Sequence, residues 1–357
     1  MMKDEQVGEV LSGNMLEMFT SVSRILEDRP DLFPLALEVL ENQRKASMRR
    51  RSFEDRGIHV PPFMILSVTN RCNLNCLGCY AKKLQDQKGA EMDDATLKRI
   101  IGEAKDLGIS VILTAGGEPL IRSGLFDIIS DNPEIIFPIF TNGTMLDEKK
   151  VDEIKEIKNV VPILSIEGER NLTDGRRGTG IYDMIRRSSK LLGDASIFWG
   201  VSVTVTSENF DTVTSDAFIE DLCGKGCHLF FFVEYIPVSE GTEHLEPSMD
   251  QRKKLNDLSY EMKERFPGIF ICFPGDEEQY GGCLSSGRGF VHINPQGELE
   301  PCPFAPYSDT DLKETTLEKA LGSKLLAEIR RNHDKIEETS GGCALWKNRD
   351  WVRSLMR

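Results

Sequence analysis

A strand candidate at residues 64–69 runs directly into Thr69-Asn70-Arg71-Cys72-Asn73-Leu74-Asn75-Cys76-Leu77-Gly78-Cys79-Tyr80. Its three cysteines have the spacing C-x3-C-x2-C. Since cubane iron–sulfur clusters are normally held by four cysteines, three thiolates leave one iron open for an external ligand. Zinc is the alternative, but zinc prefers four ligands, typically as two C-x2-C pairs, and no fourth ligand lies nearby. The stretch therefore predicts a cluster at the carboxyl end of a strand, where parallel barrels place their chemistry.

A repeated strand–helix order follows this loop. Apolar strand candidates lie at residues 64–69, 110–115, 135–141, 160–166, 197–206 and 228–236. Helical candidates lie between them at residues 93–107, 123–130, 147–158, 182–192 and 210–223. This order predicts an α/β fold with a parallel sheet and right-handed crossovers. Six strands fit a partial (β/α)6 barrel or an open doubly wound sheet, and the hydrophobic periodicity does not distinguish these two folds.

The two ends of the chain differ from this central region. Near the N-terminus, apolar residues recur with the spacing of one buried helix face, at Leu11, Met15, Met18, Phe19, Val22, Ile25 and Leu26. A second helix is expected at residues 35–48, ending in a solvated basic run, Arg49-Arg50-Arg51; a packing appendage is favoured over a docking role. Beyond residue 246, we expect a helix at 249–266, a segment rich in Gly and Cys at 272–304, and a helix at 316–338. The predicted domains are 1–59, 60–245 and 246–357.

Composition excludes several classes of protein. The 357 residues carry a net charge of −14, which argues against a general nucleic-acid binder. No apolar run reaches the roughly 18–20 residues of a membrane-spanning helix, and no signal peptide is recognisable. We therefore expect a cytoplasmic protein without a membrane partner. Nine cysteines in a reducing compartment favour metal binding over a disulfide framework.

The cysteine spacing, with Tyr80 after the last cysteine, resembles the signature of the radical S-adenosylmethionine (SAM) superfamily. The resemblance implies a partial barrel in which Cys72, Cys76 and Cys79 hold a 4Fe–4S cluster. It also implies that the amino and carboxylate groups of SAM chelate the open iron. Reductive cleavage of SAM then yields a 5′-deoxyadenosyl radical, a reaction carried by the cofactor while the protein positions it.

Several strand ends resemble SAM-binding positions of that family. Gly116 and Gly117 allow close backbone approach to a ligand, and Glu118 can accept from a cationic amine, as in the family's GGEP motif. The segment Ser165-Ile166-Glu167-Gly168 resembles the family's S-x-D-G segment, with Glu167 in place of Asp. The implied SAM-binding residues are Tyr80, Gly116, Gly117, Glu118, Thr141, Ser165, Arg177 near the SAM carboxylate, and Ile236 near the adenine. Arg186 is an alternative to Arg177.

A second cysteine set lies near the C-terminus, at Cys283, Cys302 and Cys343. Within residues 290–301, two segments with the alternating side-chain pattern of strands flank a turn, Asn294-Pro295-Gln296-Gly297. This pattern predicts a β-hairpin that brings Cys283 and Cys302 together. The order Cys283, thirteen residues, Gly297, four residues, Cys302 resembles the opening of the SPASM and twitch domains. The shortened twitch form is the better match. Some twitch domains end in a cysteine pair, whereas here Trp346 follows Cys343.

The resemblance implies a second, auxiliary iron–sulfur cluster of the 4Fe–4S type on these three cysteines. Its fourth ligand is Cys272, a side chain of another type, or the substrate. Scattered core cysteines are the alternative for the whole set. For Cys223 and Cys227 we favour a glycine-rich helix end with incidental cysteines.

The sequence thus indicates a radical SAM enzyme that abstracts hydrogen from a peptide or protein, as a maturase does. One alternative is radical oxidation or rearrangement of a small molecule. An alternative from another class is a non-catalytic iron–sulfur protein for electron transfer or assembly. An electron donor such as ferredoxin or flavodoxin is expected as a partner.

Overall fold

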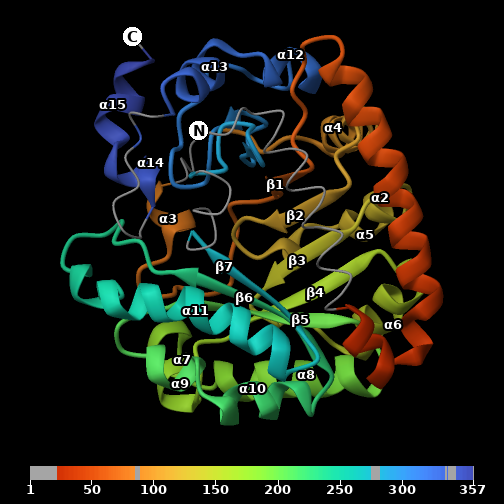
Figure 1. Cartoon of the computed structure of the whole chain (residues 1–357), viewed down its shortest axis with the longest axis vertical. Helices are drawn as coiled ribbons and strands as arrows, with labels where there is room; N and C mark the ends of the chain where they lie inside the picture. The colour runs from red at the N-terminus through yellow and green to blue at the C-terminus, as the bar shows by residue number, and fades with distance from the viewer. Residues whose placement is uncertain (1–21, 85–88, 275–281, 334–335, 337–342, 357) are drawn as a thin grey trace.

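The computed structural model describes residues 22–84, 89–274, 282–333, 336 and 343–356. Seven parallel strands dominate this part of the chain (Figure 1). They are β1 (Phe63–Ser67), β2 (Val111–Ala115), β3 (Phe137–Thr141), β4 (Val160–Ser165), β5 (Trp199–Val205), β6 (Cys227–Glu234) and β7 (Ile269–Phe273). The strands lie side by side in chain order, each parallel to the next. The partial-barrel prediction is confirmed, with β7 as a strand that the sequence analysis missed.

Helices cover one face of this sheet. They are α4 (Asp94–Leu107), α5 (Leu125–Ser130), α6 (Glu148–Ile157), α8 (Ile181–Asp194), α9 (Phe210–Val213), α10 (Asp216–Cys223) and α11 (Met249–Arg265). Side chains with polar oxygens start several of them, since Asp93 and Asp147 accept hydrogen bonds from backbone N–H groups of the first turn. Between α8 and β4 lies a helix predicted only as loop, α7 (Arg170–Arg177). None of the described helices combines the length and apolar character needed to cross a membrane.

The opposite face of the sheet is also apolar. Val161, Ile163, Leu229 and Phe231 point to this side and pack with Ile25, which comes from helical residues 22–28. The N-terminal segment therefore contributes to the barrel core. Leu11, Met15, Met18 and Phe19 lie outside the described residues.

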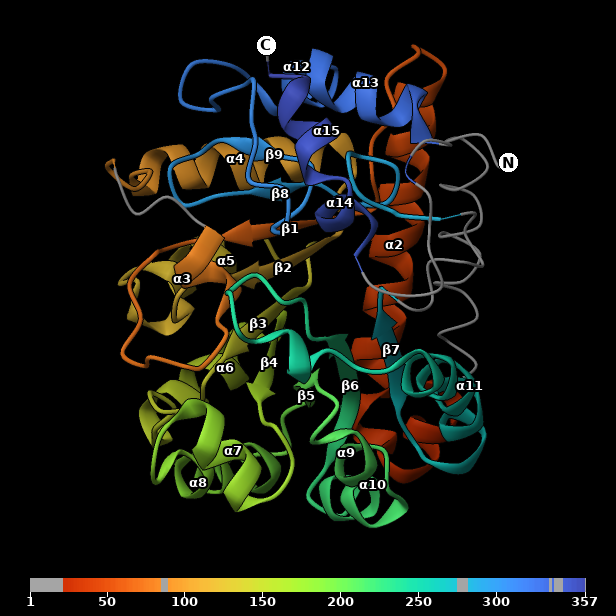
Figure 2. The same cartoon turned by 90° about the vertical axis from the view of Figure 1, so that its left-hand side faces the viewer.

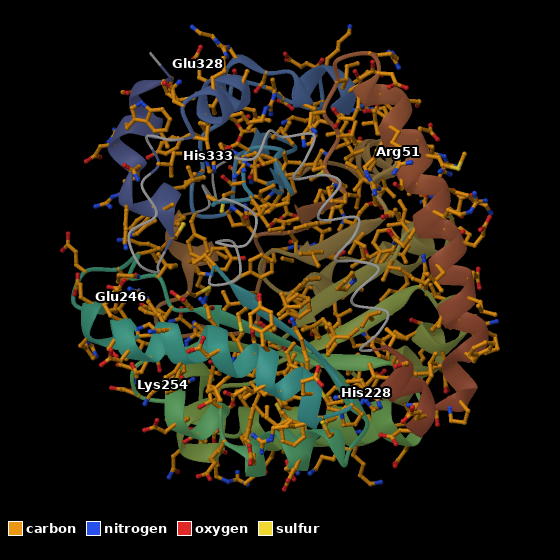
Figure 3. All side chains as sticks on the ribbon, in the orientation of Figure 1. Arg51, His228, Glu246, Lys254, Glu328 and His333 are labelled. Atoms are coloured by element: carbon orange, nitrogen blue, oxygen red, sulfur yellow. The ribbon has the colours of Figure 1, made fainter. Side chains whose placement is uncertain are left out.

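The N-terminal segment continues through η1 (Pro30–Leu32) and α2 (Phe33–Glu54), which runs beside the amino ends of the strands (Figure 1). The prediction of a solvated basic end is wrong for Arg50, which is buried and donates to Gly108 O at 2.5 Å. Burial lowers the pKa of its guanidinium to about 10, so it stays charged at neutral pH. Arg51 is exposed, as predicted (Figure 3).

The C-terminal region attaches to the first strand. The predicted hairpin is confirmed as β8 (His292–Ile293) and β9 (Leu299–Glu300), an antiparallel pair in which β8 adds in parallel to β1 (Figure 2). The helix expected at 316–338 is broken into α12 (Leu317–Leu321) and α13 (Lys324–Arg331), because Ser323 caps the second piece. Two short helices follow, α14 (Ala344–Lys347) and α15 (Arg349–Ser354). One sheet spans the two larger predicted domains, and the division at residue 245 stays a prediction.

A buried polar chain fastens the hairpin to β1. Ser67 Oγ lies 2.8 Å from His292 Nε2, and His292 Nδ1 lies 2.7 Å from Glu300 Oε2. Asn294 Nδ2 donates to the other carboxylate oxygen of Glu300 at 2.9 Å. All four members of the chain are almost fully buried, so each polar atom depends on its protein partner.

His292→Phe should destabilise the protein by about 2–4 kcal/mol, because it leaves the buried Glu300 carboxylate without its imidazole partner. A lower midpoint in urea unfolding checks this expectation. His244→Phe is the matched control, since His244 is exposed on η3 (Glu243–Leu245). Equal midpoints for the two variants would contradict the structural role of the chain.

Candidate active site

The loop that carries Cys72, Cys76 and Cys79 packs backbone to backbone against the end of β2. Gly117 N donates to Thr69 O at 2.7 Å, and Glu118 N donates to Arg71 O at 2.8 Å. A Cβ atom on Gly117 would lie 2.2 Å from Arg71 O, and one on Gly116 would lie 2.4 Å from Thr69 O. The sequence analysis assigned this close approach to a ligand. In the structure the two glycines approach the cysteine loop, which they hold in place, and their contact with a ligand stays a prediction.

The three thiols of this loop gather at the carboxyl end of the sheet, just before α3 (Tyr80–Leu84). All three are half-buried, and burial raises the pKa of Cys72, with the charges of Glu118, Cys76 and Cys79 adding to the effect. In the described ranges, no three His, Cys, Asp or Glu side chains are grouped closely enough to share one metal ion. A cubane cluster places each thiolate on a different iron, so thiols too far apart to share one metal ion can still hold a cluster.

Glu118 is fixed beside the cysteine loop. Its Oε1 accepts from Thr141 Oγ1 at 2.7 Å and from Leu120 N at 3.1 Å, and its Oε2 accepts from Asn142 N at 2.8 Å. The side chain is only 1% exposed. Burial raises the pKa of Glu118, and these hydrogen bonds act in the opposite direction. The structure thus brings together two predicted residues, Glu118 and Thr141, at adjacent strand ends.

A second buried carboxylate, Glu167, lies beyond the end of β4 and binds two arginines. Its Oε1 accepts from Arg177 Nε at 2.9 Å and also from the guanidinium of Arg176, and its Oε2 accepts from Thr204 N at 3.2 Å. Arg176 is tied to the cysteine loop as well, since its carbonyl accepts from Leu77 N at 2.9 Å. The carboxylate therefore fixes both guanidinium groups, and that of Arg176 lies near enough to the cysteine loop to interact with the charges of Cys76 and Cys79.

The placement of Arg186 separates it from the predicted site. Arg186 Nη1 donates to Asp221 at 2.6 Å on the helical side of the sheet, so it is not an alternative to Arg177. Ser165 is the last residue of β4 and pairs with Ser202 of β5, which places it at the same edge as the cysteine loop.

Tyr235 lies directly under the cysteine loop. It follows β6, is 1% exposed, and its hydroxyl would be 2.3 Å from a Cβ atom on Gly78. Gly78 has a φ of +65° and no side chain, and both properties are needed where the loop crosses the tyrosine ring. Ile236, the predicted adenine contact, is the next residue and is also buried.

The second cysteine set is brought together in the C-terminal region. Cys283, Cys302 and Cys343 belong to one apolar cluster. The Cys302 thiol donates a hydrogen bond to Cys343, which raises the pKa of Cys302 and lowers that of Cys343. Cys343 also accepts from Trp346 N at 3.4 Å. Cys272 is wrong as a fourth member, because it points into the core between β7 and α11, with its thiol 3.8 Å from Leu255 O.

An aromatic pair lies between the two cysteine sets. The ring of Tyr80 packs on Phe304 with centroids 5.0 Å apart. Burial raises the pKa of Tyr80, and its neighbours Cys79, from the first set, and Cys302, from the second, reinforce the rise. Tyr80 therefore lies between the two cysteine sets. The motif alone, in which Tyr80 follows the last cysteine, did not predict this position.

The residues around the first set fit a cluster with a bound anionic group. Three thiols supply ligands for three irons and leave one iron without a protein ligand. Two buried donors of the described residues that contact this loop, Tyr235 Oη and Arg176 Nε, have no acceptor. A group rich in acceptor atoms beside the loop would satisfy both.

The sequence analysis gave no role to Gly78, Arg176 or Tyr235, and it named Glu167 only as a departure from the S-x-D-G pattern. These four residues act through partners on other elements, so spacing along the chain did not assign them. A signal existed for two of them, since Glu167 follows the predicted strand 160–166 and Tyr235 lies near the end of the predicted strand 228–236, where side chains of parallel sheets converge.

Comparisons with known proteins agree with this geometry. The sequence model of the family described as the Radical SAM superfamily matches residues 66–217. The AdoMet-dependent heme synthase of Methanosarcina barkeri is 24% identical over 316 residues, covering 80% of this chain and 88% of the relative. The PqqA peptide cyclase of Gluconobacter oxydans is 24% identical, covering 82% and 85%. Among solved structures, Streptococcus suis SuiB bound to S-adenosylmethionine has a TM-score of 0.64 at 18% identity, covering 86% and 74%, and so has the same fold.

Gly117→Ala should displace the cysteine loop, because the new Cβ atom would collide with the Arg71 carbonyl. We expect a loss of stability of about 1–3 kcal/mol and a fall in iron bound per chain after anaerobic reconstitution. Gly102→Ala is the matched control. The added Cβ in α4 would meet no atom of a neighbouring element within 4 Å. This variant should therefore gain about 0.5–1 kcal/mol of folding stability and bind as much iron as wild type. Full iron loading of Gly117→Ala would show that the glycine does not position the loop.

Proposed function

We propose that this chain, which is a radical SAM enzyme, abstracts a hydrogen atom from a peptide or protein substrate. The observation that carries the proposal is the cysteine loop at the carboxyl end of a partial barrel, held against Gly116 and Gly117 beside buried Glu118. When bound, the 4Fe–4S cluster and SAM would supply a 5′-deoxyadenosyl radical.

The chain's own residues would bind and orient the cofactor. Cys72, Cys76 and Cys79 would ligate three irons. Glu118 would hold the amino group of SAM, and Arg177, itself held by Glu167, would face the SAM carboxylate. Ser165 and Ile236 lie at the strand ends where further SAM contacts are expected. Because the carboxylate and the guanidinium are already fixed by hydrogen bonds, little reorganisation would accompany binding.

Cys283, Cys302 and Cys343 would hold an auxiliary cluster in the same proposal. Their gathering in one buried group supports it. Tyr80 and Phe304 would then separate the two clusters with packed aromatic rings. The fourth iron of the auxiliary cluster would take a ligand other than Cys272.

Two substrate classes have support. The relative named as a peptide cyclase favours a peptide. A small molecule is the second candidate, because the heme synthase is matched over 88% of its own length. A ferredoxin or flavodoxin would supply the electron in either case. Proposed localisation is the cytoplasm, where such donors are reduced.

Reconstituted protein given SAM and dithionite under anaerobic conditions should release 5′-deoxyadenosine. Cys72→Ala should reduce the product to background, because one iron of the cluster loses its thiolate. Cys223→Ala is the matched control, since this half-buried cysteine is not a ligand of either predicted cluster. Product from Cys72→Ala at the control level would refute the assignment of the cluster to this loop.

Cys302→Ala should lower the iron bound per chain by roughly half, because one of two four-iron clusters would lose a ligand. Iron analysis together with the 5′-deoxyadenosine assay checks this, and SAM cleavage should persist. An unchanged iron content would contradict the auxiliary cluster.

Substrate class is tested by deuterium transfer into 5′-deoxyadenosine. A deuterated peptide substrate should transfer its label, and a deuterated iron porphyrin should not. Transfer from the porphyrin alone would replace the peptide proposal by the small-molecule one.

A further inference from the structure

We propose that the hydroxyl of Tyr235 donates a hydrogen bond to a sulfide of the cluster held by Cys72, Cys76 and Cys79, and so raises the reduction potential of that cluster. The inference rests on the proposed function and extends it to a residue outside the cysteine motif.

The ring of Tyr235 has a fixed position. Its backbone N–H donates to Val205 O at 2.8 Å, which prolongs the pairing of β5 with β6. The side chain is 1% exposed and lies against Gly78, between Cys76 and Cys79. Even one methyl group on Gly78 would collide with the ring, so the hydroxyl is held next to the loop.

Among the described residues the hydroxyl has no hydrogen-bond partner, although it is fully buried. A buried hydroxyl without a partner costs free energy, and a phenylalanine would fill the same space without this cost. Packing against Gly78 therefore does not explain the choice of tyrosine. An acceptor that arrives with the cofactor does explain it.

A second donor at this loop has the same property. Arg176 Nε is buried and has no acceptor among the described residues, although Nη1 of the same guanidinium binds Glu167 and Thr204. Arg176 also lies close enough to Cys76 and Cys79 for its charge to interact with theirs. Arg176 Nε can only donate and the Tyr235 hydroxyl is able to donate, so a single acceptor with negative charge suits both groups. The sulfides and thiolates of an iron–sulfur cluster have this character.

A hydrogen bond to a cluster sulfur has a defined consequence. It stabilises the reduced cluster more than the oxidised one, because the reduced cluster carries more negative charge. Hydrogen bonds to the sulfurs are among the factors that set cluster potentials. Tyr235 would thus ease the uptake of the electron that SAM cleavage consumes.

The test compares Tyr235→Phe with wild type in redox titrations monitored by electron paramagnetic resonance. We expect full iron loading and a midpoint potential more negative than that of wild type, already without SAM. Tyr260→Phe is the matched control, because Tyr260 is half-exposed on α11, and its potential should be unchanged. Before reconstitution, Tyr235→Phe should melt at the same temperature as wild type or higher, because the hydroxyl has no partner among the described residues.

Three results would overturn the proposal. An unchanged potential both with and without SAM would show that the hydroxyl reaches neither group. A shift that appears only after SAM is added would assign the hydroxyl to SAM instead of the cluster. A lower melting temperature before reconstitution would reveal a partner within the protein. In each case wild type would still load its cluster and cleave SAM, whereas failure of the proposed function would remove that activity from wild type itself.

Discussion

The close contact between the cysteine loop and the end of β2 is the constraint on which the rest of the site depends. Thr69 and Arg71 present carbonyl groups, and the backbone at Gly117 and Glu118 presents N–H groups to them, with no room for a side chain between. Two backbone hydrogen bonds of this kind set the height of the loop above the sheet. The same contact fixes the start of the Glu118 side chain, because its own N–H makes one of the two bonds.

Two buried carboxylates extend this arrangement to the neighbouring strands. Glu118 is satisfied largely by backbone N–H groups and the Thr141 hydroxyl, whereas Glu167 is satisfied largely by Arg176 and Arg177. The first carboxyl group lies beside the cysteines, where burial raises its pKa. The second holds two guanidinium groups in a fixed orientation. Carboxyl and guanidinium groups thereby have defined places at the carboxyl edge of one sheet.

The sequence predicted what depends on local pattern. The strands from β1 to β6 and most of their helices follow the periodicities of two and 3.6 residues, and the cysteine spacing is local too. It did not predict β7, a five-residue run beside a cysteine-rich segment, or the helix that carries Arg176. Cys272 was misassigned because a strand alternates its faces, and only the structure shows that Phe270 and Cys272 share the face covered by helices. Likewise, the contact of Tyr235 with Gly78 joins residues far apart in the chain.

Addition of the hairpin to β1 also bears on the order in which the protein can be assembled. Ser67 and His292 are 225 residues apart, yet they meet across neighbouring strands. During synthesis from the N-terminus, the outer side of β1 therefore stays unpaired until nearly the whole barrel has left the ribosome. An unpaired strand edge is a template for association with other chains, and contacts of such long range form slowly. The strand that leads into the cysteine loop is thus the last of the parallel strands to gain its second neighbour, and until then the newly made barrel is open to misassociation on that side.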